Sequence, residues 1–480
     1  MQRGIPGANG RVFVATVAAA TGSRKSRRPV RRSRLTDRTK QAFAIAFIFL
    51  AALAMRWWYM ERLVIPQPVR GDALQYVRYA NNIMDHGVFS RGTSTPPQPD
   101  GYFTPGYPLF LVACIRSAKA VGVDPYQFLL STQAVIGALT AVLTFLLARL
   151  CIGLWASITA ALLTVLSPHL VSHGGYILTE TLFGFLLALA LYLFASGILR
   201  RRHARLIASG GVFGYAYLVN PIVMFAPLLL TPVALIFARP NQTDRRAIVV
   251  GLLLYLAVFG AWQWRNKVEV AHEASGSADR IFWNFIIGMH SDYHEIWRKN
   301  PRDPNNPADL DRKALGGSYQ ALAETLWQRV RQDPGHYLSW YLVKKPLQLW
   351  GWDILIGQGD IYVYPVTQSL YSTSRLAWLS EAVIKSLHYW LVAAALLGLL
   401  YLWRDERPAT RLTLISLYVA LVYISVVYVL LHAEPRYSVP LQPEMHIGAL
   451  YFLSQVFRSI DKLRRRSRQD LAGKPIDQRT

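Results

Sequence analysis

Long apolar blocks separated by polar stretches run through most of the chain. Residues 177–199 and 248–262 hold a single charged side chain between them. About 20 apolar residues are enough to cross a bilayer as a helix. A helix also satisfies its own backbone polar groups, as the bilayer core requires. The pattern therefore predicts an all-α integral membrane protein.

We predict ten membrane-spanning helices within one membrane domain, residues 41–457. The predicted spans are 41–59, 128–149, 153–170, 178–199, 206–219, 222–237, 247–264, 386–403, 412–431 and about 439–457. The dipeptide Asn220–Pro221 is a break between the fifth and sixth spans. Two long loops remain, a first outer loop over 60–126 and a second over 265–385.

Basic residues cluster beside the apolar blocks, at 24–40, 200–205 and 464–468. With the N-terminus inside, ten spans place these clusters on the cytoplasmic side, as the positive-inside rule requires. Both basic tails, 1–40 and 458–480, are then cytoplasmic, and the first is predicted to be disordered.

This topology depends on residues 106–121, which are apolar but hold Arg116 and Lys119. If they crossed the membrane, every later loop would change sides. We predict instead an interfacial helix within the first outer loop.

Composition supports the membrane interpretation. The chain has 480 residues, 52% of them hydrophobic, a mean hydropathy of +0.22 and a formal net charge of +24. Such a charge could indicate nucleic acid binding. Because the basic residues flank apolar blocks, we assign them to the membrane and expect no nucleic acid partner. The two cysteines, Cys114 and Cys151, fall on opposite predicted sides, so no disulfide is expected.

Three polar motifs fall on the predicted outer side. In the first, Asp72, Tyr76 and Tyr79 share one face of a predicted helix. Asp72 could alternatively cap the start of that helix. About thirty residues later, the turn 102–108, which includes Tyr107, leads into the interfacial helix.

The second motif is Leu178-Thr179-Glu180, at the start of the fourth span. A carboxylate is favoured at a helix N-terminus, so Glu180 could simply be an interfacial capping residue. His169 and His173 lie upstream and could indicate zinc, although their spacing matches no strong metal motif.

The third motif is His432-Ala433-Glu434-Pro435-Arg436-Tyr437, in a tight loop between two spans. The planar fork of an arginine suits phosphate, because it offers paired charge-assisted hydrogen bonds. The alternative is a Glu434–Arg436 pair that only orders the loop. Carboxylates, an arginine and aromatic residues at one membrane face suit a reaction on a lipid-anchored anionic substrate.

These motifs together resemble bacterial members of the GT-C superfamily of glycosyltransferases. The chain is similar to the protein O-mannosyltransferases and lipid A aminoarabinose transferases, related to glycosyltransferase family 39. The motifs that carry the resemblance are Asp72 with Tyr76 and Ala80, Thr104-Pro105-Gly106-Tyr107-Pro108-Leu109, Leu178-Thr179-Glu180 and Glu434-Pro435-Arg436-Tyr437.

The resemblance implies a GT-C helical bundle in the bacterial cytoplasmic membrane. It also implies inverting transfer of a sugar from a polyprenyl-phosphate donor to a glycolipid, glycan or protein acceptor at the outer face. Asp72 would be the general base, Glu180 would help to position a substrate, and Arg436 would lie near the donor phosphate. The substrate site would further include Tyr76, Tyr107, His432, Glu434 and Tyr437.

This sequence departs from many relatives in its first outer loop. They carry an acidic pair there, whereas Asp72 lies between Gly71 and Ala73. This departure weakens the case for a metal, and no cofactor is expected, although a divalent metal stays open.

Two other classes of protein remain as alternatives. One is a transporter or flippase of envelope lipids, which would need a continuous central pathway. The other is a structural subunit of an envelope assembly. A single outer cavity that unites Asp72, Glu180 and Arg436 would favour the transferase.

Overall fold

The computed structural model describes residues 31–237, 242–271, 276–301 and 303–472. The chain divides into two compact units, Met1–Phe43 and Ala44–Thr480. The described residues form helices joined by loops, with isolated β-bridges such as Val64–Gln368. The predicted all-α class is confirmed. Most of the predicted N-terminal tail lies outside the described residues, and its last ten residues form the start of α1.

Within the described residues, each of the ten predicted spans overlaps one longer helix. These helices are α1 (Arg31–Arg62), α4 (Pro125–Cys151), α5 (Leu154–Leu166), α7 (Glu180–Leu199), α8 (His203–Val219), α9 (Ala226–Phe237), α10 (Gln242–Glu269), α18 (Arg375–Tyr401), α19 (Pro408–Leu430) and α20 (Gln442–Ala472).

Six helices in the described part of the chain are long and apolar enough to cross a membrane. A seventh is added if α5 and the following segment Pro168–Gly175, which bend by 51°, count as one span. Pro168 explains the bend, since proline cannot donate the hydrogen bond that would continue α5. A multi-pass membrane protein is thus confirmed. The number ten stays a prediction, because α8 and α9 are short and α20 is not among the candidate spans.

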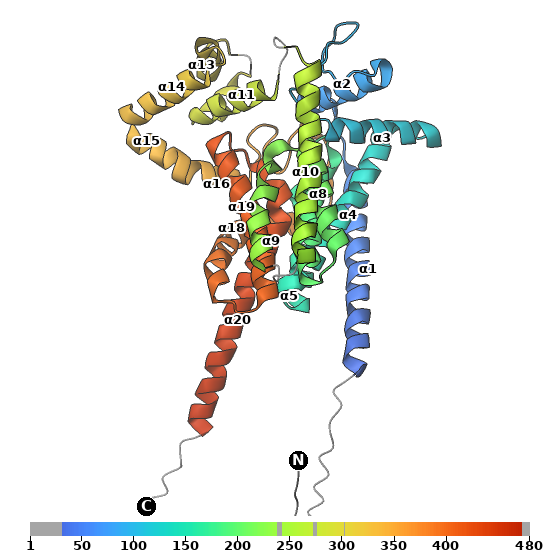
Figure 1. Cartoon of the computed structure of the whole chain (residues 1–480), viewed down its shortest axis with the longest axis vertical. Helices are drawn as coiled ribbons and strands as arrows, with labels where there is room; N and C mark the ends of the chain where they lie inside the picture. The colour runs from blue at the N-terminus through green and yellow to red at the C-terminus, as the bar shows by residue number, and fades with distance from the viewer. Residues whose placement is uncertain (1–30, 238–241, 272–275, 302, 473–480) are drawn as a thin grey trace, which may run out of the picture. The chain divides into compact units, whose positions relative to one another are not determined.

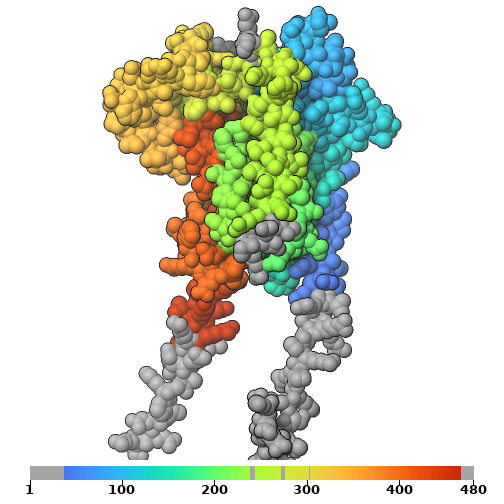
Figure 2. Space-filling view, viewed as in Figure 1, coloured from blue at the N-terminus to red at the C-terminus, as the bar shows by residue number. Residues whose placement is uncertain are grey.

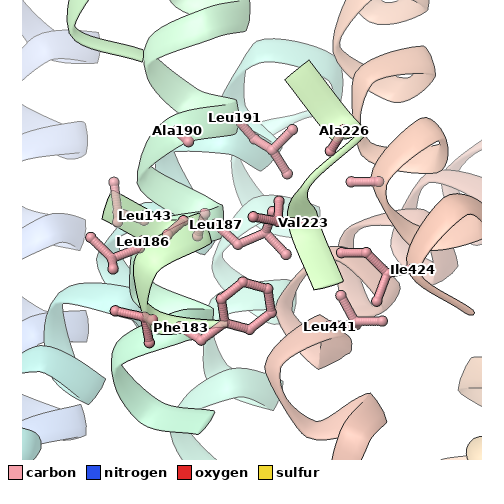
Figure 3. Packing of buried hydrophobic residues seen from close by; sticks show 14 of the residues in the cluster. Leu143, Phe183, Leu186, Leu187, Ala190, Leu191, Val223, Ala226, Ile424 and Leu441 are labelled. Atoms are coloured by element: carbon pink, nitrogen blue, oxygen red, sulfur yellow. The ribbon is translucent and has the colours of Figure 1, made fainter. Parts of the chain in front are cut away.

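The apolar core joins helices that are distant in sequence. Helix α7 packs against α4 and α8, and α8 packs against α10. Figure 3 shows Leu187, Val223 and Leu441 among the buried side chains of this core. Helices α8 and α10 cross at Gly210 and Gly251, where an added Cβ on Gly210 would overlap the facing backbone. Small residues allow such close crossings in membrane bundles.

Helices of the two long loops gather at one end of the bundle, which we call the loop end (Figure 1). Figure 2 shows residues near 71–121 and residues near 277–345 projecting on either side of this end. The helices are α2 (Gly71–His86), α3 (Gly106–Val121), α11 (Ser277–Met289), α12 (Tyr293–Lys299), α13 (Pro307–Leu315), α14 (Tyr319–Gln332), α15 (Pro334–Ser339) and α16 (Lys345–Leu349).

Helix bounds agree with the prediction in some places and differ in others. Helix α3 spans the predicted residues 106–121, and a break occurs at Asn220 as expected. Helix α18 begins earlier than predicted, because Ser374 caps it by accepting from Ala377 N–H at 3.4 Å. Helix α20 starts with Pro443 in its first turn, where its missing N–H costs nothing, and continues well beyond residue 457.

Candidate functional site

The motif His432–Tyr437, which we call the arginine loop, connects α19 to α20 at the loop end. Its first ordering element is Glu434, whose side chain is fully buried. One carboxylate oxygen accepts the N–H of Arg436 at 3.0 Å. The other accepts the N–H groups of Leu355 and Ile356 at 2.8 and 3.1 Å. Glu434 therefore shapes the loop through backbone contacts.

The guanidinium of Arg436 binds a carboxylate from the other half of the chain. Its Nη2 donates to Oδ2 of Asp72 at 2.8 Å. Asp72 lies in the first turn of α2, which begins at Gly71 with a left-handed φ of +52°. Arg70 is the N-cap of α2, and no side chain caps this helix. Asp72 therefore does not cap α2, and its carboxylate pairs with Arg436 instead.

Glu180 is the third charged member of the site. It starts α7 as predicted, and its Oε1 lies 3.8 Å from Nε of Arg436. Burial disfavours the charge on Arg436, but the carboxylates of Asp72 and Glu180 raise its pKa, so the guanidinium stays charged. The structure therefore unites Asp72, Glu180 and Arg436 in one site.

Arg280 on α11 adds a second cation that sequence reasoning missed. Its guanidinium carbon lies 4.4 Å from the centre of the Phe103 ring. Burial would raise the pKa of Asp72, but Arg436 and then Arg280 outweigh this effect and lower it below the ordinary value. Arg280 had no distinguishing signal in the sequence, because it is one of many arginines in a long polar region.

Buried aromatic side chains pack around Tyr76, one turn beyond Asp72 on α2. The Tyr76 ring lies 5.0 Å from the rings of both Phe103 and Tyr107. The hydroxyl of Tyr107 donates to Gln133 on α4 at 3.3 Å. Tyr364, also missed in the sequence, accepts the N–H of Ala73 at 3.3 Å and so contacts the start of α2. The predicted turn 102–108 therefore packs against α2, the helix that carries Asp72.

His432 and Tyr437 are anchored by stacking at the two ends of the arginine loop. The His432 ring stacks on His294 with centroids 5.0 Å apart. The Tyr437 ring stacks on Tyr428 of α19 at 4.7 Å and 17°. These contacts hold the loop backbone on both sides of Arg436.

The two histidines upstream of Glu180 bind backbone carbonyls. Nε2 of His169 lies 2.8 Å from the carbonyl oxygen of Trp352, and Nδ1 of His173 lies 2.7 Å from that of His169. Within the described residues, no group of three or more His, Cys, Asp or Glu side chains could hold a metal ion. Cys114 and Cys151 are buried free thiols.

The fold and the site together define a class. This is a multi-pass, all-α membrane protein with two carboxylates and two guanidinium groups at its loop end. Residues 108–264 match the family of dolichyl-phosphate-mannose-protein mannosyltransferases. The match confirms the predicted resemblance to GT-C glycosyltransferases. The matched residues include Glu180 but neither Asp72 nor Arg436. These two residues are assigned to the site from its geometry.

Comparisons with solved structures find related helical arrangements at low identity. The chain is similar to the archaeal oligosaccharyltransferase of Archaeoglobus fulgidus, in complex with an inhibitory peptide and a dolichol-phosphate, with 15% identity and a TM-score of 0.48. That alignment covers 92% of this chain and 53% of the other, so the chain spans about half the length of that protein. It is also similar to ArnT from Cupriavidus metallidurans bound to undecaprenyl phosphate, with 13% identity, a TM-score of 0.35, and coverage of 85% and 77%. None of the curated proteins compared with the sequence matches it.

Proposed function

We propose that this protein transfers a sugar from a polyprenyl-phosphate donor to a glycolipid, glycan or protein acceptor, with inversion. The reaction would take place at the outer face of a bacterial cytoplasmic membrane. The observation that carries the proposal is the contact of Arg436 with both Asp72 and Glu180, which lie far apart in the sequence. This arrangement places an acid and a phosphate-binding cation side by side.

The two guanidinium groups suit the phosphate of such a donor. Arg436 has a buried Nε without a hydrogen-bond partner, and Arg280 acts on the same carboxylate, Asp72. Guanidinium groups bind phosphate through short, charge-assisted hydrogen bonds. They would also stabilise the negative charge that grows on the phosphate as the sugar leaves.

Asp72 is the candidate general base. In the structure its pKa is lowered by Arg436 and Arg280 after burial is overcome, so it is ionised at neutral pH but weakly basic. A bound donor phosphate would neutralise part of the charge on Arg436. The pKa of Asp72 would then rise, and the carboxylate would accept the acceptor's hydroxyl proton more readily. Donor binding would thus activate the base.

An apolar groove offers a place for the polyprenyl chain. It has a volume of about 500 Å³ and is lined by parts of α16, α18 and α19, including Leu347, Leu396, Val426 and Leu430. Leu430 is the last residue of α19, so one end of the groove lies beside the arginine loop. A lipid chain in this groove would have one end near the loop that carries Arg436.

The activity is tested with radiolabelled polyprenyl-phosphate sugars. Proteoliposomes that contain the purified protein receive a panel of these donors with candidate acceptors. Transfer of label from at least one donor, reduced roughly 100-fold or more in Asp72→Asn, supports the proposal. Movement of labelled lipid across the bilayer without loss of its sugar would overturn it and favour a flippase.

The proposed location has its own test. Reporter fusions after Arg202, Arg245 and Arg407 should report the cytoplasm, and fusions near Asp72 and Asn305 should report the outside. With both termini cytoplasmic, this pattern places the site on the outer face. An outside signal at Arg202 would contradict it.

A further inference from the structure

Lys345 has no exposed surface, although it is a lysine on a helix at the loop end. Its Nζ donates to the carbonyl oxygens of Gly288 and Leu431 at 3.1 and 2.9 Å. Gly288 lies near the end of α11, and Leu431 directly precedes the arginine loop. One ammonium group therefore joins α11, α16 and the loop that carries Arg436.

The backbone at Gly288 contacts the same carbonyl. A Cβ added there would overlap the carbonyl oxygen of Leu431 and lie 2.9 Å from Nζ of Lys345. The indole N–H of Trp340 donates to the Gly288 carbonyl at 2.9 Å. The contact between α11 and the arginine loop thus requires glycine at position 288, because a larger residue would clash with Leu431.

Further hydrogen bonds attach the loop to the same outer region. Nε2 of Gln348, one turn beyond Lys345, donates to the Ala433 carbonyl at 2.6 Å. The N–H groups of Leu355 and Ile356 bind Glu434 within the loop. The path of the arginine loop is therefore held by the second long loop of the protein.

Stability alone does not explain the choice of lysine. Burial lowers the pKa of Lys345 to about 7, and among the described residues no carboxylate offsets that effect. Removing an ammonium group from water costs several kcal/mol, and an apolar side chain of similar volume is often less costly. What lysine adds is a pair of hydrogen bonds to two backbone segments.

We propose that Lys345 is a positioning residue, which fixes the arginine loop so that Arg436 can bind the donor phosphate. The inference rests on the proposed function for the identity of the ligand. Lys345 itself has no exposed surface and would not contact the donor. Its effect would pass through Leu431 and the loop backbone.

The test compares Lys345→Met with Lys344→Met in full-length protein in phosphatidylcholine nanodiscs. Lys344 is the adjacent, exposed residue, so the control makes the same chemical change without the buried contact. The readouts are hydrogen exchange of the loop amides, thermal stability and affinity for undecaprenyl phosphate. Lys345→Met should speed exchange of the Arg436 amide and weaken binding roughly 10-fold, without lowering the melting temperature. Lys344→Met should match the wild type.

Gly288→Ala perturbs the same contact from the other side and leaves Lys345 in place. It should also speed exchange in the arginine loop. Wild-type exchange in a folded Lys345→Met protein would overturn the inference. The inference would also be overturned if Lys345→Met lost affinity only to the extent that it lost thermal stability. If the wild type fails to bind undecaprenyl phosphate, the proposed function fails, and the exchange comparison still decides whether Lys345 fixes the loop.

Discussion

Two acid–arginine pairs lie at opposite ends of α19 and differ in almost every respect. Asp405 and Arg407 precede the helix, and Arg436 with Asp72 lies beyond its other end. With a rise of about 1.5 Å per residue, a helix of this length separates the pairs by roughly 35 Å. We call them the turn pair and the site pair.

The turn pair is local and saturated. Nε and Nη2 of Arg407 donate to the two oxygens of Asp405 at 2.9 and 2.6 Å, and the Arg407 N–H adds a third bond. Gln455 on α20 also donates to Asp405, at 3.0 Å. A carboxylate with this many donors has little capacity for another ligand, so its role is to close the turn between α18 and α19.

The site pair is long-range and incompletely satisfied. One hydrogen bond joins residues that are 364 positions apart, and Nε of Arg436 has no hydrogen-bond partner. The Asp72 side chain is 38% exposed, compared with 4% for Asp405. The comparison teaches how a functional acid–arginine pair differs from a structural one. A pair is a candidate for chemistry when some of its donors and acceptors have no partner in the folded protein.

The largest effect is expected for Asp72→Asn. Loss of the general base should lower the turnover number by roughly 100- to 10,000-fold. The folded state should persist, because the asparagine keeps the shape of the side chain. Single-turnover transfer of radiolabelled sugar measures this rate. A well-folded variant with near-normal turnover would show that the site pair, like the turn pair, has no catalytic role.

A smaller effect, mainly on affinity, is expected for Arg436→Ala. Truncating one partner of a buried, charged contact costs at least about 2 kcal/mol, which corresponds to roughly a 30-fold weaker donor affinity. The donor KM should therefore rise more than the turnover number falls. Equal loss of donor affinity in Asp72→Asn would indicate that Asp72 only organises the site.

The pH profile should show whether Arg436 controls the ionisation of Asp72. Arg436→Gln removes the main influence that lowers the pKa of Asp72, while burial, which raises it, remains. Activity requires the ionised carboxylate, so the acidic limb of kcat/KM should move to higher pH in this variant. The wild type should keep its activity to lower pH, when both are measured with the same donor. Coincident acidic limbs would show that Asp72 does not control this part of the profile.

The smallest effect is expected at the turn pair. Asp405→Asn should lower the free energy of unfolding by about 1 kcal/mol, since Arg407 is partly solvated and its pairing is screened. The melting temperature in nanodiscs should fall slightly, and transfer per folded molecule should stay unchanged. A large loss of transfer at normal stability would show that this pair also contributes to function.

The sequence predicted the helices that carry the site residues better than the distant residues that contact them. The starts of α2 and α7, which carry Asp72 and Glu180, were readable from local polar residues at the edges of apolar blocks. Arg280 and Lys345 were missed, because each acquires its role only through contact with a distant segment. The early start of α18 was missed because hydropathy detects the apolar stretch and not the capped polar turns before it.

By itself the sequence determined the helical class, the long apolar segments and the candidate acids and arginine. These depend on patterns within about 20 residues, the length that a helix needs to cross a bilayer. Only the tertiary structure decided that Arg436 pairs with Asp72 and approaches Glu180, and that Glu434 binds backbone instead. The physical reason is that a charge in a poorly solvated site must find partners in space. The packing of α2, α7 and the arginine loop at one end supplies them.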